Sequence, residues 1–115
     1  MKEITRKNWE TVIEQSLQNP YFLYLETPLC GTCKMGKKMF EVAVETIRVQ
    51  KDENIAVGVS NINEMPELAA KYGVTSVPCL LILSRGIAID RIYALQSAGN
   101  IYKSMLKLVE KEYKG

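Results

Sequence analysis

The sequence contains no histidine and only three cysteines, so it has few of the side chains that hold transition metals. Structural zinc normally requires four cysteine or histidine ligands, a set that one copy of this chain cannot supply. Three is also an odd number of cysteines, which is not typical of a framework of structural disulfides. We therefore expect no resident metal and no permanent cross-link, and any chemistry between cysteines should be transient.

The chain also lacks a long apolar run and a block of charges of one sign. No stretch approaches the roughly 18 apolar residues of a membrane span, and the opening "MKEITRKNWE" lacks the apolar core of a secretion signal. Lys and Arg number 15 against 13 Asp and Glu, and the lysines are interspersed with glutamates. The composition predicts a cytoplasmic protein that binds neither membrane nor nucleic acid.

No internal repeat, linker or low-complexity segment divides the 115 residues. This length suits one continuous core, and 47% apolar with 24% charged residues is typical of a globular chain. We therefore expect residues 1–115 to form a single domain, and we expect a monomer.

The spacing of apolar residues predicts an α/β chain. Helical periodicity marks 8–18, 33–50 and 98–109, and a short helix should begin near Pro66 and end at Gly73. Apolar β-rich runs at 21–26 and 55–63 flank the long helix, which favours a parallel pair with a right-handed crossover. Residues 77–95 form two β-rich arms around Ser84-Arg85-Gly86 and predict an antiparallel hairpin.

Cys30 and Cys33 have two residues between them and lie between the predicted strand at 21–26 and the long helix. Near the N-terminus of that helix, unpaired N–H groups and the helix dipole stabilise negative charge, which favours a lowered thiol pKa for Cys30. Cys33 would stay within bonding distance in the first turn, with Gly31 easing the approach. The pattern favours a redox dithiol in which Cys30 attacks a disulfide and Cys33 resolves the intermediate.

Other interpretations of the pair remain open. Free cysteines are often simply buried, so Cys30 and Cys33 could be inert core thiols. A zinc ion or iron–sulfur cluster shared between subunits through Cys30 would escape the ligand count of one chain. A non-enzymatic redox-sensing module, whose dithiol closes under oxidation and changes the affinity for a partner protein, would use the same residues without turnover.

The segment "CGTCKM" at 30–35, after an apolar strand, and "AAKYGVTSVPCLLIL" at 69–83 together resemble the thioredoxin family. The order of predicted elements extends the resemblance over nearly the whole chain. It implies a thioredoxin fold, with a central mixed β-sheet flanked by helices on both faces. It also implies that Cys30 is the exposed nucleophile and Cys33 the buried resolving cysteine.

The resemblance further implies a substrate-binding surface. Pro78 would carry a cis peptide bond facing the dithiol, and the backbone of Val77 would pair with an extended substrate strand. Gly31 and Thr32, between the cysteines, are expected to contact the substrate as well. The implied activity is the reduction of protein disulfides without a bound cofactor, with electrons from a dithiol donor such as a thioredoxin reductase.

Several positions depart from the family pattern. Thioredoxins usually carry tryptophan before the first cysteine and proline between the two cysteines, where this chain has Leu29 and Thr32. Ala94 stands where thioredoxins tend to have a substrate-facing glycine. A buried aspartate and a lysine on the neighbouring strand are replaced by Tyr24 and Val59. These departures predict a specialised or slower member of the family.

Glu26 is a candidate substitute for the missing aspartate. It has the same strand parity as Tyr24, so it should project to the same side, one pleat nearer the cysteines. We hypothesise that Glu26, or water near it, helps to deprotonate Cys33 during resolution. The alternative is a solvated side chain at the end of a strand.

Cys79 is the third cysteine and follows Pro78 directly. Strand alternation points its side chain away from the side that the resemblance assigns to substrate. We therefore expect a buried packing residue in preference to a third redox thiol.

Overall fold

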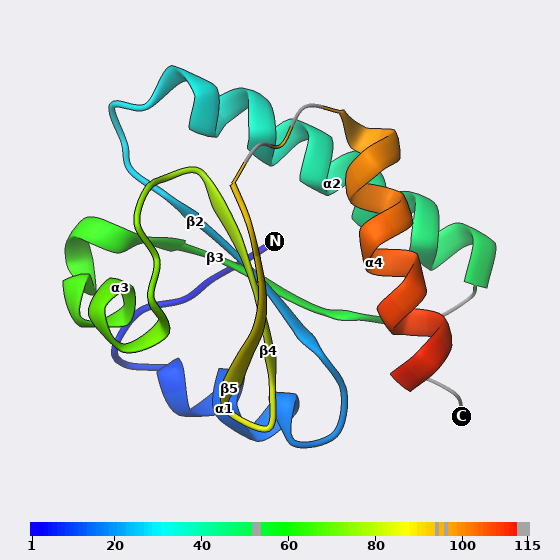
Figure 1. Cartoon of the computed structure of the whole chain (residues 1–115), viewed down its shortest axis with the longest axis horizontal. Helices are drawn as coiled ribbons and strands as arrows, with labels where there is room; N and C mark the ends of the chain where they lie inside the picture. Colours follow the sequence, from blue (N-terminus) through cyan, green and yellow to red (C-terminus); the bar gives the residue numbers. More distant parts are fainter. Residues whose placement is uncertain (52–53, 94, 96, 113–115) are drawn as a thin grey trace.

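The computed structural model describes residues 1–51, 54–93, 95 and 97–112. Its strands form one five-stranded sheet in the order β1-β3-β2-β4-β5, with helices on both faces (Figure 1). The elements are β1 (Lys2–Glu3), α1 (Trp9–Ser16), β2 (Tyr21–Glu26), α2 (Gly31–Lys51), β3 (Ala56–Asn61), the 3₁₀ turn η1 (Ile62–Glu64), α3 (Pro66–Tyr72), β4 (Cys79–Ser84), β5 (Ile87–Ile92) and α4 (Ala98–Glu112).

The sheet is mixed, as predicted. β2 pairs in parallel with β3 through the α2 crossover, and it pairs antiparallel with β4, which continues into the antiparallel β5. β2 and β4 are therefore covered on both faces and have neighbours on both edges. Continuous apolar runs such as "YFLYL" and "CLLIL" are typical of strands in that position.

Alternate residues of the central strands divide the core into two clusters. The α2/α4 cluster contains Phe22, Tyr24, Phe40, Ala43, Val44, Ile47, Ile55, Val59, Leu80, Ile82, Ile101, Met105 and Val109. The α1/α3 cluster on the other face contains Ile4, Val12, Tyr21, Leu23, Leu25, Met65, Leu68, Tyr72, Val74, Cys79, Leu81 and Leu83. Even positions of β2 thus face α2 and α4, and odd positions face α1 and α3, as the two-residue period of a strand requires.

The β4–β5 hairpin turns at Arg85 and Gly86, whose φ angles are 52° and 75°. Two-residue hairpin turns favour positive φ at both positions, which glycine adopts without strain. The C-terminal end of α1 holds this turn: the N–H of Arg85 donates to the Ser16 carbonyl at 2.7 Å, and the N–H of Gly86 donates to Ser16 Oγ at 2.9 Å. These two hydrogen bonds therefore connect the C-terminal end of α1 to the β4–β5 turn.

The predicted order of elements is confirmed except that β1 and η1 were not predicted, and several predicted bounds differ from those of the structure. The sequence analysis missed β1, because a strand of two exposed residues carries no periodic pattern. It extended the second predicted strand to residue 63, whereas β3 ends at Asn61, whose side-chain oxygen accepts from the N–H of Asn63 and opens η1. It also began the long helix at 33, two residues later than the structure does.

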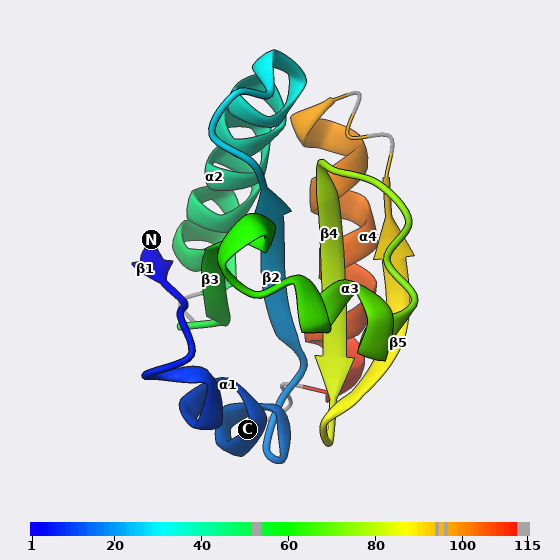
Figure 2. The same ribbon diagram turned by 90° about the vertical axis from the view of Figure 1, so that its left-hand side faces the viewer.

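This topology places the dithiol segment and the start of β4 at the same end of the sheet. β2 runs into the loop that precedes α2, and β4 begins at the same end of the sheet (Figure 2). Cys79 pairs with Leu25 in the antiparallel register, so Pro78 lies beside the end of β2.

No helix among the described ranges is long and apolar enough to cross a membrane.

Candidate redox site

Cys30 is the N-cap residue of α2. Its carbonyl accepts the N–H of Lys34 at 3.4 Å, and its Sγ accepts the N–H of Cys33 at 3.1 Å. A side-chain acceptor at the cap that binds the N–H three residues later is the arrangement that serine and aspartate make at helix starts. Here a sulfur atom takes that place, at the positive end of the helix dipole.

The two cysteines are close enough to exchange electrons with each other. Their Cα atoms are 5.1 Å apart, within the range that a disulfide spans, and the structure joins Cys30 and Cys33 in a disulfide. Cys33 is fully buried, whereas Cys30 is partly exposed. The Thr32 hydroxyl lies 3.3 Å from Cys30 Sγ as a further polar contact. When the disulfide is open, these donors favour a thiolate on Cys30.

Tyr24 lies beneath the dithiol and supports the first turns of α2. Its hydroxyl donates to the Cys33 carbonyl at 2.6 Å, and its ring stacks on Phe40 with centroids 5.8 Å apart. Burial of the side chain and the nearby charge of Glu26 raise the pKa of Tyr24 well above its ordinary value. The hydroxyl is therefore a hydrogen-bond donor here and does not take the place of an ionised carboxylate.

Gly36 provides the room that the Tyr24 hydroxyl occupies. A Cβ atom at residue 36 would lie 2.5 Å from the Tyr24 oxygen and 3.3 Å from Cδ1 of Leu95. This pairing was not predicted from the sequence. A glycine within the buried row of a long helix was the only available signal, and it does not identify the side chain that fills the space.

The position of the expected family lysine is also apolar. Val59 pairs with Tyr24 across β2 and β3 and is buried in the α2/α4 cluster. Tyr24 and Val59 therefore supply no acid–base pair beneath Cys33.

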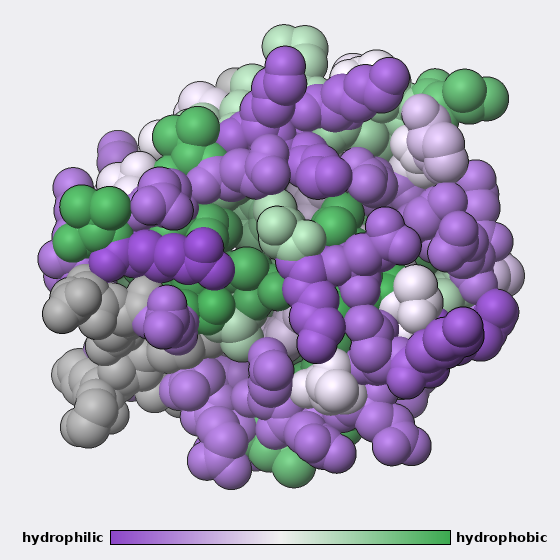
Figure 3. All heavy atoms as spheres, turned by 180° about the vertical axis from the view of Figure 1, so that it is seen from behind, coloured by the Kyte–Doolittle hydropathy of each residue, from purple (hydrophilic) through white to green (hydrophobic). Residues whose placement is uncertain are grey.

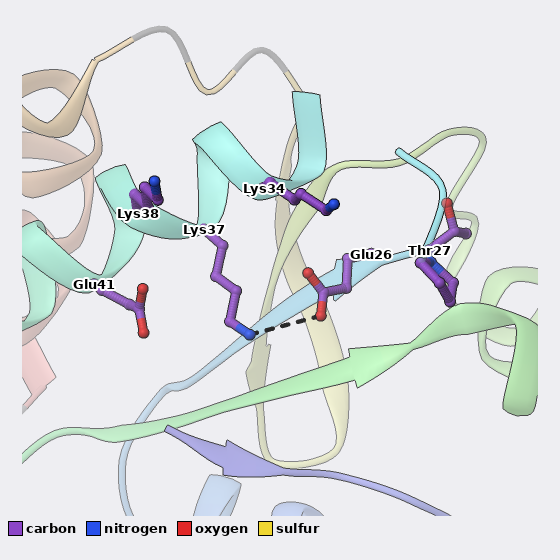
Figure 4. A pocket seen from close by; sticks show the side chains of 7 residues that line it. Glu26, Thr27, Lys34, Lys37, Lys38 and Glu41 are labelled. Carbon is purple, nitrogen blue, oxygen red and sulfur yellow. Dashed lines mark ion pairs between the residues drawn. The ribbon is translucent and has the colours of Figure 1, made fainter. Parts of the chain in front are cut away.

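Glu26 projects toward α2, on the side that strand parity predicts. Its side chain is 24% exposed, and its carboxylate lies 3.8 Å from Nζ of Lys37 (Figure 4). Within the described part of the chain, Glu26 makes no hydrogen bond to Cys33. Its suggested part in deprotonating Cys33 stays a prediction.

The substrate-binding residues expected from sequence lie near the same end of the sheet. The Val77–Pro78 peptide bond is cis, and both residues are half-buried. Gly31 and Thr32 are exposed at the start of α2. Leu29, next to Cys30, is fully exposed. Ala94 lies outside the described residues.

Cys79 is completely buried in the α1/α3 cluster, as predicted. Burial raises the pKa of the Cys79 thiol to about 12. The thiol is therefore protonated near neutral pH, which suits a packing residue. Among the described residues, no group of three or more cysteine, aspartate or glutamate side chains could hold a metal ion.

The native fold should protect Cys79 from alkylation at pH 9, because the folded thiol remains protonated and inaccessible while an unfolded thiol is about half ionised at that pH. A raised folded pKa contributes stability below the unfolded pKa of about 9, and this contribution is lost as pH rises through about 12. Mass spectrometry after iodoacetamide treatment, with and without denaturant, measures the protection. Rapid labelling of the native protein would contradict the burial.

The sequence and the fold of this chain are similar to those of known proteins. The family model described as Thioredoxin matches residues 1–107. "Thioredoxin-like protein YusE" of Bacillus subtilis (strain 168) is 37% identical over 83 residues, which cover 72% of this chain and 74% of the relative. "Thioredoxin 1" of Synechococcus elongatus is 30% identical over 83 residues, 72% of each chain. The X-ray structure of Fasciola hepatica thioredoxin matches with a TM-score of 0.69 at 18% identity, covering 97% of this chain and 99% of that one, and confirms the predicted fold.

Proposed function

Because this chain belongs to the thioredoxin family, we propose that its thiol–disulfide oxidoreductase activity reduces disulfides in protein substrates through Cys30. The Cys30 thiolate attacks one substrate sulfur, forms a mixed disulfide and releases the other substrate sulfur as a thiolate. The Cys33 thiolate then attacks Cys30 Sγ, releases the second substrate thiolate and closes the Cys30–Cys33 disulfide. Two electrons pass to the substrate, whose thiolates take up two protons.

The contact from the N–H of Cys33 to Cys30 Sγ carries this proposal. It joins the sulfur to the start of α2, where negative charge is stabilised, and it keeps the two cysteines adjacent. The difference in exposure supports the division of roles, because a substrate disulfide reaches the partly exposed Cys30 and not the buried Cys33.

Substrate binding is proposed for the four residues around the dithiol. Val77 offers backbone groups to an extended substrate segment, and Pro78 has no N–H that would compete for the sulfur or the substrate. Gly31 and Thr32 are exposed between the cysteines and contribute little steric obstruction.

Multiple turnover is the decisive test of the proposed activity. Purified protein at a small fraction of the substrate concentration, supplied with a dithiol donor, should reduce many equivalents of a disulfide-containing protein. Reduction that stops after one equivalent would contradict an enzyme and favour a redox-sensing module.

Glu26→Gln should slow mixed-disulfide resolution about tenfold or more and alter its pH dependence, if Glu26 or a water beside it accepts the Cys33 proton. The position of Glu26 at the end of β2, on the α2 side, motivates this proposal. Stopped-flow measurement of substrate release from a preformed mixed disulfide gives the rate at each pH. Lys37→Gln is the matched control, because it breaks the same ion pair and leaves the carboxylate in place. An unchanged pH profile in Glu26→Gln would eliminate the role.

Electrons for each cycle are proposed to come from a dithiol donor such as a thioredoxin reductase, with the chain acting as a monomer. We place the reaction in the cytoplasm, where thiols are kept reduced, because continuous disulfide reduction needs a steady supply of reductant. Oxidation of NADPH coupled through a reductase, together with the mass in solution, checks the donor and the monomer. Trapping the dithiol by alkylation in fractionated cells checks the compartment.

A further inference from the structure

A pocket of about 430 Å³ opens beside the dithiol, between the end of β2 and one flank of α2. Three of its side chains are lysines from the first part of α2 (Figure 4). The residues that line it are Glu26, Thr27, Pro28, Lys34, Lys37, Lys38 and Glu41. Pro28 is two residues from Cys30, so their Cα atoms lie within about 7 Å of each other.

The charges of this pocket are not balanced at the end nearest the dithiol. Lys37 lies 3.8 Å from Glu26, and these two side chains offset each other. Lys34 and Lys38 are exposed, and neither makes an ion pair within the part of the chain that the structure describes. Glu41 lies farther along α2, whereas Lys34 directly follows Cys33. The Cys30 end therefore combines a free ammonium group with the positive end of the helix dipole.

Five of the seven residues that line the pocket carry a charge, and three of those five are lysines. The molecule seen from behind is mainly hydrophilic, with small separate apolar areas (Figure 3). An uncompensated lysine beside a reacting centre attracts carboxylates and repels other ammonium groups. The flexible stems of Lys34 and Lys38 let both ammonium groups follow a ligand that is not held rigidly.

We propose that this pocket binds acidic side chains of the substrate protein, so that the chain prefers disulfides flanked by aspartate or glutamate. The proposal rests on the proposed function, because the attacked disulfide must be held at Cys30. An extended chain advances about 3.3 Å per residue, so a carboxylate within about four residues of the attacked cysteine reaches Lys34 and Lys38. Lys34 and Lys38 are then specificity-determining residues and take no part in electron transfer.

Three matched disulfide-linked peptides test the preference. They carry glutamate, glutamine or lysine at the same positions within four residues of the disulfide and are otherwise identical. We expect kcat/KM for the glutamate peptide to exceed that for the lysine peptide about tenfold at low ionic strength. The ratio should fall to about twofold in roughly 0.5 M salt, because salt screens exposed charges.

The variant Lys34→Gln/Lys38→Gln should lower the glutamate-to-lysine ratio to about twofold at low salt. The matched control is Lys103→Gln/Lys107→Gln, which removes two exposed charges from α4, away from the pocket, and should keep the tenfold ratio. Each ratio compares two peptides on one protein, so a change in the thiolate fraction of Cys30 cancels.

The outcomes separate this inference from the proposed function. Equal ratios in the wild type and in Lys34→Gln/Lys38→Gln would overturn the pocket as an acid-binding site. Similar rates for all three peptides with the wild type would also overturn it, while the reductase activity would stand. Failure of the wild type to reduce any peptide or protein disulfide would contradict the proposed function and, with it, the preference.

Discussion

Replacing Cys30 with serine should abolish catalysed disulfide reduction, lowering kcat/KM by more than about 1000-fold, while the fold stays as stable as that of the reduced wild type. A serine hydroxyl cannot form the mixed disulfide. It is, however, among the preferred N-cap groups, and its Oγ can accept the Cys33 N–H that Cys30 Sγ accepts now. Turnover and denaturant unfolding, both measured in the presence of reductant, give the two quantities.

Two further cysteine variants test whether Cys30→Ser loses activity because Cys30 is the nucleophile. Cys33→Ser should still attack the substrate but accumulate the Cys30 mixed disulfide, visible by mass spectrometry as a covalent adduct. Cys79→Ser should retain turnover, because Cys79 lies in the α1/α3 cluster and away from the dithiol chemistry. Substantial turnover by Cys30→Ser, or an adduct formed through Cys79, would refute the assignment of the nucleophile.

Gly36→Ala should destabilise the protein by about 1 to 3 kcal/mol, although alanine is the better helix former. Alanine stabilises a helix by about 1 kcal/mol relative to glycine, so the expected destabilisation must come from contacts of the new methyl group with surrounding residues. The new Cβ would lie 2.5 Å from the Tyr24 oxygen, and the buried ring is stacked on Phe40 and cannot move freely. Overpacking costs about 1 to 3 kcal/mol, and losing the bond from Tyr24 to the Cys33 carbonyl adds about 1. Urea unfolding gives the free energy directly.

Tyr24→Phe provides the partner for a double-mutant cycle. Removing the hydroxyl leaves two neighbours of a Cβ at residue 36: Cδ1 of Leu95 at 3.3 Å, which is the end of a flexible side chain, and the ring carbon Cζ at 3.5 Å, which is an ordinary contact. In that background Gly36→Ala should be neutral or stabilising by up to about 1 kcal/mol, giving a coupling energy of about 1 to 4 kcal/mol. An equal cost of Gly36→Ala in both backgrounds would show that the Tyr24 hydroxyl is not the obstacle.

Much of the fold could be predicted because the relevant signals are local. "YFLYLE" is a short apolar run between two prolines, and β2 occupies those residues. Pro66 and Gly73 mark the ends of α3 as the sequence indicated. β1 could not be predicted, because two exposed residues have no period and form a strand by pairing with β3.

The candidate site likewise has features that the sequence predicts and features that it does not. The closeness of Cys30 and Cys33 follows from their spacing and from the strand-to-helix junction, which sequence reveals. The contacts of Tyr24 with Gly36 and of Glu26 with Lys37 join β2 to α2 in three dimensions. Their partners depend on how the helix is rotated over the sheet, and no pattern within either segment specifies that rotation.

The two hydrogen bonds between Ser16 and the β4–β5 turn connect an early part of the chain to a late one. One serine supplies acceptors for two backbone N–H groups, and the one at Gly86 lies 70 residues away. A polypeptide that stops before residue 85 would leave the end of the first helix without these donors and β4 without its outer neighbour. The redox pair lies in the first third of the chain, and the sheet that holds it is complete only after the β4–β5 hairpin has been synthesised.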